Sequence, residues 1–197
     1  MNITLHHQKK LVSLAFGFIA FIISIASSAR ALQYTGLNLA GADFGVVGGA
    51  YGSSYLYPNQ TEVDYFLSKG MNIARLPFLW ERLQPSLNAA LDSAESNRLD
   101  TFVSTTTSKG MYVMLDPHNY ARYNGNLIGS ASVPVTAFSN FWWRVANIYR
   151  TNNHVIFGLM NEPHDMTTEA WRNAANAAIV AIRNTGATNL IDRKSVV

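Results

Sequence analysis

A glutamate that directly follows an apolar run is the residue of this chain best placed to do chemistry. Residues 155–160, Val-Ile-Phe-Gly-Leu-Met, are apolar, which is typical of a buried strand in a parallel sheet. Glu162 comes just after this run, and the carboxyl ends of parallel strands are where α/β proteins bind ligands and place catalytic groups. Glu162 is therefore a candidate acid. The alternative is that Asn161, Glu162 and Pro163 form a simple turn with a solvated carboxylate.

Polar side chains also interrupt or follow two earlier apolar segments. Arg75 lies inside the segment 71–77, and His118 and Asn119 follow the segment 111–115. A buried arginine is costly unless it is paired, so we expect Arg75 to contact a carboxylate or to lie at the wet end of its strand. Taken alone, His118 would be an ordinary hydrogen-bonded loop residue.

Strands and helices are expected to alternate along the chain and to position these groups. The pattern predicts strands at 34–41, 71–77, 111–115 and 155–160, helices at 59–70, 91–109, 134–149 and 167–184, and the start of a fifth strand at 189–191. Asn59 and Glu62 have the spacing of a capping box, although Asn59-Gln60-Thr61 is also a glycosylation sequon. Within the third helix, at least one of Trp142 and Trp143 should face the core.

Strict alternation of strand and helix indicates a single domain with a parallel sheet, either doubly wound or closed into a barrel. The sequence contains neither a Gly-x-Gly-x-x-Gly turn nor a Walker-type loop, which disfavours the nucleotide-binding doubly wound folds. Polar and aromatic residues instead follow several strands, which suits a TIM (β/α)8 barrel. Neither a cofactor nor a metal is expected, since no His-x-x-x-His spacing supports Asp116 or His164 as ligands.

The amino-terminal 31 residues have the layout of a secretory signal peptide. Lys9 and Lys10 precede an uncharged apolar run at 11–25, and Ala29-Arg30-Ala31 resembles a cleavage site. The run is short for a membrane span, so an uncleaved anchor is the weaker alternative. The leader carries the whole formal net charge of +3, which leaves no basic surface to suggest nucleic acid or stable membrane association. We expect a secreted protein, stabilised by its core because it has no cysteine.

Three motifs together resemble glycoside hydrolase family 5, particularly its cellulases. They are Asn-Ile-Ala-Arg-Leu-Pro-Phe-Leu-Trp-Glu-Arg-Leu-Gln-Pro at 72–85, Leu-Asp-Pro-His-Asn-Tyr-Ala-Arg-Tyr-Asn-Gly at 115–125 and Leu-Met-Asn-Glu-Pro-His-Asp at 159–165. They occur in the order and spacing of that family. The resemblance implies a retaining, endo-acting hydrolase of β-1,4-glucan, monomeric when complete.

The resemblance also implies roles for individual residues. Glu162 matches the general acid/base, one of two carboxyl groups that retaining glycosidases place roughly 5 Å apart. Its pKa would be raised by partial burial and by the second carboxylate. Asn161 matches the residue that binds the sugar 2-hydroxyl, Arg75 the arginine that supports the nucleophile, and His118 a histidine of the site.

Substrate-binding residues are expected in the loops after the strands. Trp80, Tyr120 and Tyr123 are candidate platforms for glucosyl rings, because sugars present apolar CH faces to aromatic planes. The alternative is that they are ordinary amphipathic loop aromatics. Asn119 and His164 are further candidates for contact with the substrate.

The chain is short for the barrel it resembles. A complete barrel takes roughly 250 residues, so these 197 residues, less the leader, are expected to form about its first half. The resemblance places the nucleophile glutamate at the end of strand seven, beyond this sequence, and Glu81, Asp116 and Asp165 are expected to be loop residues from the wrong strands to replace it. Residues 192–197 are expected to be a non-native tail, with a genuine early stop as the alternative.

Three other functions stay open at this point. The chain could be a non-catalytic carbohydrate-binding half-barrel, or a hydrolase of mannan or of mixed-linkage glucan. The first differs from an enzyme in that Glu162 would do no chemistry.

Overall fold

Five parallel strands form the main sheet of the computed structural model, which describes residues 32–193. The predicted leader, residues 1–31, and residues 194–197 of the predicted tail lie outside the described residues. The sheet has the order β1-β2-β3-β6-β7, and every neighbouring pair is parallel. Its strands are β1 (Gly36–Asn38), β2 (Ile73–Phe78), β3 (Tyr112–Pro117), β6 (Val155–Gly158) and β7 (Ile191–Asp192).

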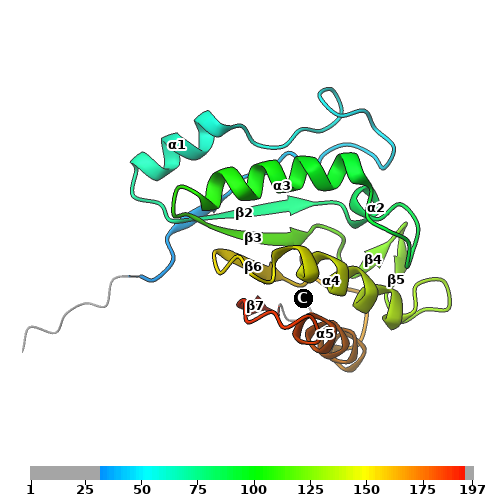
Figure 1. Cartoon of the computed structure of the whole chain (residues 1–197). Coiled ribbons are helices and arrows are strands. Elements are labelled where there is room, and N and C mark those ends of the chain that lie inside the picture. Colours follow the sequence, from blue (N-terminus) through cyan, green and yellow to red (C-terminus); the bar gives the residue numbers. More distant parts are fainter. Residues whose placement is uncertain (1–31, 194–197) are drawn as a thin grey trace, which may run out of the picture. The chain divides into compact units, whose positions relative to one another are not determined.

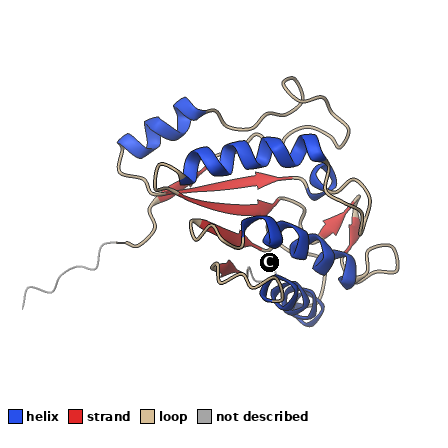
Figure 2. Ribbon diagram, viewed as in Figure 1, coloured by secondary structure: helices blue, strands red, loops and turns tan. Residues whose placement is uncertain are grey.

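Helices connect the strands in the predicted alternation (Figure 1), with α3 packed against β3 and the helices drawn in blue in Figure 2. The long helices are α1 (Gln60–Ser68), α3 (Ser93–Thr107), α4 (Val135–Tyr149) and α5 (Thr168–Arg183). Helices α4 and α5 pack closely against each other. All four helices and all five strands expected from the sequence are confirmed, with boundaries shifted by a few residues.

The helix ends follow the predicted capping chemistry. Asn59 Oδ1 accepts a hydrogen bond from the Glu62 backbone N–H at 3.1 Å, and Glu62 Oε2 accepts one from the Asn59 N–H at 2.8 Å, so the capping box is confirmed. Helices α1 and α3 are each followed by a glycine with positive φ, 82° at Gly70 and 83° at Gly110. This left-handed conformation costs glycine little, which explains why the helices end there.

The core lies between the sheet and its helices. All four residues of β6 are buried, as its unbroken apolar sequence predicts. Trp142 of α4 is fully buried and its indole N–H donates to the Leu159 carbonyl at 3.2 Å, whereas Trp143 is 43% exposed. One tryptophan of the pair therefore faces the core, as expected.

Two small elements were not expected. Residues predicted to be loop form the short helix α2 (Trp80–Leu83), and an antiparallel hairpin is made by β4 (Arg122–Tyr123) and β5 (Asn126–Leu127). Both lie beyond the arrowheads of β2 and β3 in Figure 1. They are too short to show a periodic apolar pattern. In addition, β7 includes Asp192, one residue beyond the predicted end of the domain.

The long segment between β1 and α1 is anchored on a buried carboxylate. Glu95 of α3 is only 3% exposed and accepts hydrogen bonds from Tyr55 Oη at 2.7 Å, Tyr57 Oη at 2.9 Å and Arg98 Nη1 at 2.7 Å. Burial, together with the hydrogen bond to Glu95, raises the pKa of Tyr55 to about 12. Tyr57 lies in the same environment. Its burial and the charge of Glu95 hold its pKa well above the usual range. The segment is thereby fixed to the helix layer.

Candidate active site

Hydrogen bonds between strand ends bring the predicted site residues to one edge of the sheet. The backbone N–H of His118 donates to the Phe78 carbonyl at 2.7 Å, and that of Asn161 donates to the Pro117 carbonyl at 2.9 Å. These bonds continue the ladder past the ends of β2, β3 and β6. Backbone pairing therefore places His118 beside the carboxyl end of β2 and Asn161 beside the carboxyl end of β3, and Arg75 lies within β2.

Arg75 is the centre of the polar network. Its Nε donates to Asp116 Oδ2 at 2.6 Å, its Nη2 donates to Asn161 Oδ1 at 2.7 Å, and its Nη1 donates to Asn38 Oδ1. The side chain of Asp116 is fully buried and that of Arg75 is 21% exposed. The expectation that a carboxylate pairs with Arg75 is confirmed, and the partner is Asp116 of the neighbouring strand. A guanidinium held by three acceptors, two on the strands β1 and β3 and one in the loop after β6, has a fixed orientation.

His118 and Asn161 extend this network towards the loops. Asn161 Nδ2 lies 3.5 Å from His118 Nε2, and Tyr120 Oη lies 2.9 Å from the same nitrogen. The rings of His118 and Tyr120 meet edge to face, with their centroids 5.1 Å apart. Tyr120 is half-buried and has a positive φ of 54°. It therefore contacts the site histidine, whether or not its ring also contacts a ligand.

Glu162 lies directly beside this network in the chain and points to solvent. Its backbone φ is 34°, a left-handed conformation that costs a non-glycine residue roughly 1–3 kcal/mol. The side chain is exposed, and within residues 32–193 it has no hydrogen-bond or ion-pair partner, so the expected partial burial is absent from this part of the chain. An exposed, unpaired carboxylate on a strained backbone is free to meet a ligand at the strand ends.

Two of the expected sugar platforms are buried. Trp80 is 0% exposed and packs against Tyr123, Phe138 and Phe141, with ring centroids 4.8–5.6 Å apart. Its indole N–H donates to Gln84 Oε1 at 2.9 Å. Tyr123 is 5% exposed and donates its hydroxyl to the Gln84 carbonyl at 2.8 Å. The prediction that these rings stack on sugars is therefore wrong, because neither presents a face to solvent.

Asn119 is likewise used inside the protein. It is 8% exposed, its Oδ1 accepts from the Trp80 backbone N–H at 2.8 Å, and its Nδ2 donates to Glu81 Oε2 at 2.5 Å. Glu81 also accepts from the Asn124 backbone N–H at 2.6 Å. The predicted role of Asn119 in substrate binding is corrected accordingly. The hydrogen bonds of Asn119 and Glu81 join α2 to the loop after β3. They therefore hold in place the loop that carries Tyr120.

His164 forms part of a charged cluster at the rim. His164 Nδ1 lies 2.8 Å from Asp165 Oδ2, and Arg122 Nη2 donates to the same oxygen at 2.9 Å. The His164 hydrogen bond, with the charge of Arg122 also contributing, lowers the pKa of Asp165. The His164 ring lies 5.4 Å from that of Tyr120, centroid to centroid. Its predicted contact with substrate stays a prediction.

Two of the three other carboxylates do not occupy the positions expected of them. Asp116 lies inside β3 and Glu81 inside α2, so both differ from the predicted loop placement, whereas Asp165 does lie in a loop. The two misplaced carboxylates are buried and already bonded, to Arg75 and to Asn119 respectively. The sequence analysis did not identify Asn38 as a site residue. A polar residue at the end of the first predicted strand is the signal that could have identified it.

The geometry supports hydrogen bonding and proton transfer at this edge. Within the part of the chain that the structure describes, no group of three or more His, Asp or Glu side chains is arranged to hold a metal ion. Across the same residues, no helix has the length and apolar character needed to cross a membrane.

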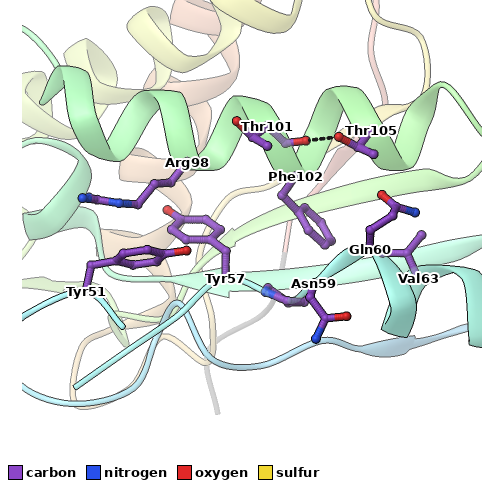
Figure 3. Close-up of a pocket in the computed structure, with 10 residues that line it drawn as sticks. Tyr51, Tyr57, Asn59, Gln60, Val63, Arg98, Thr101, Phe102 and Thr105 are labelled. Carbon is purple, nitrogen blue, oxygen red and sulfur yellow. Dashed lines mark hydrogen bonds between the residues drawn. The ribbon is translucent and has the colours of Figure 1, made fainter. Parts of the chain in front are cut away.

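A separate cavity of about 350 Å³ lies between α1 and α3, away from this edge. Figure 3 shows it lined by Tyr51, Tyr57 and Arg98 on one side and by Phe102 and Val63 farther along. Many of its polar side chains are already bonded locally. Thr105, for example, donates to the Thr101 carbonyl. None of the predicted site residues lines this cavity.

The strands of this parallel sheet follow one another in chain order, without the reversal of a doubly wound sheet, and polar residues gather at their carboxyl ends, which is the arrangement of the TIM-barrel class. The family model Cellulase (glycosyl hydrolase family 5) matches residues 27–192, and the chain belongs to this family. The described strands and helices therefore correspond to the first four βα units and the start of the fifth strand of a (β/α)8 barrel, as predicted.

Similar proteins include both curated relatives and solved structures. A probable endo-beta-1,4-glucanase B of Neosartorya fischeri is 38% identical over 185 residues, which are 88% of this chain and 55% of the relative. The structure of the endo-beta-1,4-glucanase Xac0029 from Xanthomonas axonopodis pv. citri is 46% identical with a TM-score of 0.82, covering 84% of this chain and 53% of that one. A structure of XacCel5A in complex with cellopentaose is 43% identical with a TM-score of 0.82, covering 83% and 53%. The chain thus spans about half the length of the proteins it matches.

Proposed function

We propose that this chain carries the general acid/base half of a retaining, endo-acting hydrolase of β-1,4-glucan. The observation that carries the proposal is the placement of Glu162 next to the network of Arg75, Asn161 and His118 at the strand ends. Membership of the family supports the same reading of these residues. Among possible polysaccharides, cellulose-type chains are favoured over mannan because relatives are named endo-beta-1,4-glucanases and one similar structure holds cellopentaose.

In the proposed mechanism, Glu162 protonates the oxygen of the leaving sugar while a second carboxylate attacks the anomeric carbon. Glu162 then removes a proton from the water that releases the glycosyl group. Asn161 uses its Nδ2 to donate to the 2-hydroxyl, since its Oδ1 is held by Arg75. Arg75 supports the attacking carboxylate electrostatically, and we propose that this nucleophile comes from a segment beyond residue 197.

The substrate would lie across the strand ends, next to His118, Tyr120 and His164. His118 Nε2 and the Tyr120 hydroxyl are 2.9 Å apart and face the same space as Asn161 Nδ2. We also propose that the protein is secreted, on the layout of residues 1–31, and that it acts as a monomer on an external polysaccharide.

The experiment compares Glu162→Gln with the wild type in the protein expressed from the complete gene that encodes this chain. Two substrates are used: an unactivated cello-oligosaccharide and an aryl cellobioside whose leaving group needs no proton. Loss of general-acid help should lower the rate on the first by about 10²–10⁴-fold. Formation of the glycosyl-enzyme from the aryl substrate, followed as the initial burst of phenolate, should be nearly unchanged. Equal losses on both substrates would remove Glu162 from the acid role.

The same comparison decides whether the protein is instead a non-catalytic carbohydrate-binding module. Such a module would bind cellopentaose with equal affinity in the wild type and in Glu162→Gln, and would release no reducing ends in either.

A further inference from the structure

The amide of Asn161 has only one possible orientation. Arg75 is a pure donor, and its Nη2 lies 2.7 Å from Asn161 Oδ1, so this atom must be the carbonyl oxygen of the amide. The amide nitrogen, Nδ2, is then the atom that lies 3.5 Å from His118 Nε2. Asn161 therefore presents N–H groups towards the histidine.

This orientation favours one tautomer of His118. Nε2 faces the amide donor of Asn161, which suits the acceptor nitrogen of a neutral imidazole. The Tyr120 hydroxyl, 2.9 Å from Nε2, can donate to it in this tautomer. The single proton of the neutral imidazole is then on Nδ1.

The Nδ1 atom of His118 is buried and, within residues 32–193, has no hydrogen-bond partner. A buried N–H without an acceptor costs roughly 1–3 kcal/mol. The carboxylate oxygen Oδ2 of Asp43 lies 3.9 Å away, with the Asp43 side chain only 10% exposed. A hydrogen bond needs about 2.7–3.2 Å, so a movement of about 1 Å closes this gap.

Asp43 is held in place by its own loop. Its Oδ1 accepts a hydrogen bond from the Gly41 backbone N–H at 2.9 Å, which leaves Oδ2 facing His118. On either side of Asp43, the buried guanidinium of Arg82 donates to the carbonyls of Ala42, at 2.7 Å, and of Phe44. The loop therefore presents the carboxylate in a fixed direction.

We propose that Asp43 is a positioning residue of the active site, which accepts the Nδ1–H of His118 and thereby fixes its tautomer and ring orientation. His118 Nε2 is then kept as the acceptor nitrogen that faces the Tyr120 hydroxyl and the Asn161 amide. Carboxylates that orient metal-binding histidines change metal affinity or activity by about 10–100-fold when removed, and we expect an effect of that order for Asp43 and His118. The kinetic part of this inference rests on the proposed function, whereas the tautomer does not.

Asp43→Asn is the informative substitution, because it changes a single atom type. The Gly41 N–H would still require an oxygen at the Oδ1 position, so the new NH₂ group would face His118 Nδ1. Two donors would then oppose each other unless the imidazole proton moves to Nε2, where it would meet the Asn161 amide. We expect the tautomer to reverse and the contact with Asn161 to weaken. Asp100→Asn, an exposed carboxylate on α3, is the matched control for loss of one negative charge.

The test uses the protein from the complete gene, labelled with ¹⁵N at its histidines, at a pH where the imidazoles are neutral. The His118 resonances are assigned with His118→Gln. We expect the Nδ1–H form in the wild type and in the Asp100→Asn control, and the Nε2–H form in Asp43→Asn. We also expect kcat/KM for cello-oligosaccharides to fall about 10–100-fold in Asp43→Asn alone.

An Nε2–H tautomer in the wild type would overturn the proposal without any variant having to fold. So would an Asp43→Asn protein with an unchanged tautomer and unchanged kcat/KM. If the wild type hydrolysed no glucan, the proposed function would fail, while the tautomer measurement would still decide the role of Asp43.

Discussion

Removal of the Arg75 side chain should destabilise the protein strongly, because it leaves a carboxylate without its guanidinium in the interior. Asp116 is fully buried and its Oδ2 is 2.6 Å from Arg75 Nε. Breaking a buried ion pair from one side typically costs 3–5 kcal/mol. Arg75 is 21% exposed, so solvent already screens the pair in part. We therefore expect Arg75→Ala to lower the free energy of unfolding by about 3 kcal/mol.

Arg75→Lys separates the charge from the geometry. Lysine retains a positive charge for Asp116 but cannot also reach the amides of Asn38 and Asn161, which Arg75 bonds with its two Nη atoms. Both bonds have a charged donor, and such bonds contribute about 1.5–3 kcal/mol each. Because lysine keeps a positive charge beside Asp116, the loss of stability should be smaller than for Arg75→Ala. Asn161 still loses the contact that orients it, so kcat/KM should fall as well.

Urea unfolding of the protein from the complete gene measures these free energies, with Arg172→Ala as the control. Arg172 pairs with Glu169 on the surface of α5 and is 56% exposed, so its loss should cost no more than about 1 kcal/mol. If Arg75→Ala cost no more than this control, the view that Arg75 holds the buried network together would be refuted.

Three further predictions concern stability. Trp80→Phe should lower the free energy of unfolding by about 1–3 kcal/mol and leave KM for cellopentaose unchanged, since the ring is buried. Tyr55→Phe should cost about 1–3 kcal/mol at neutral pH, because Glu95 loses a donor at 2.7 Å. The raised pKa of Tyr55 means that its stabilising effect is present below pH 10 and is lost as the pH rises towards about 12, so the variant should lose less stability over that window. Gly158→Ala should destabilise, because a Cβ would lie 3.2 Å from the Leu115 carbonyl oxygen.

Urea unfolding and steady-state kinetics check all three. A rise in KM for Trp80→Phe at unchanged fold would restore a stacking role for that ring. Parallel pH profiles of wild type and Tyr55→Phe above pH 10 would contradict the assigned pKa shift, and a Gly158→Ala protein of wild-type stability would show that the sheet yields easily at that position.

The long elements could be predicted because their patterns are local. Residues 155–160 are uniformly apolar and β6 is uniformly buried, and the Asn59 capping box marks the start of α1 in the sequence itself. Pairing of Arg75 with a carboxylate followed from the cost of burying a charge, although the sequence could not say that the partner would be Asp116.

The loops could not be predicted in the same way, because their side-chain contacts are long-range. Trp80 and Tyr123 are 43 positions apart in the chain and pack together only after α2 and the hairpin have formed. The side chain of Asn119 likewise makes its hydrogen bonds to Trp80 and Glu81 only once the loops have folded together. Aromatic and amide side chains after a strand suit sugar binding and core packing equally well, and only the fold distinguishes the two.

The most direct test of the central claim, that Glu162 is the acid/base of a retaining mechanism, is azide rescue of Glu162→Ala in the protein from the complete gene. Azide attacks the anomeric carbon of the glycosyl-enzyme and displaces the enzyme carboxylate without needing a base, so it bypasses the step that Glu162 assists. With an aryl cellobioside as substrate, we predict that azide accelerates turnover of Glu162→Ala but not of the wild type, and that NMR identifies the product as the β-glycosyl azide. No acceleration of Glu162→Ala, or an α-configured product, would contradict the account.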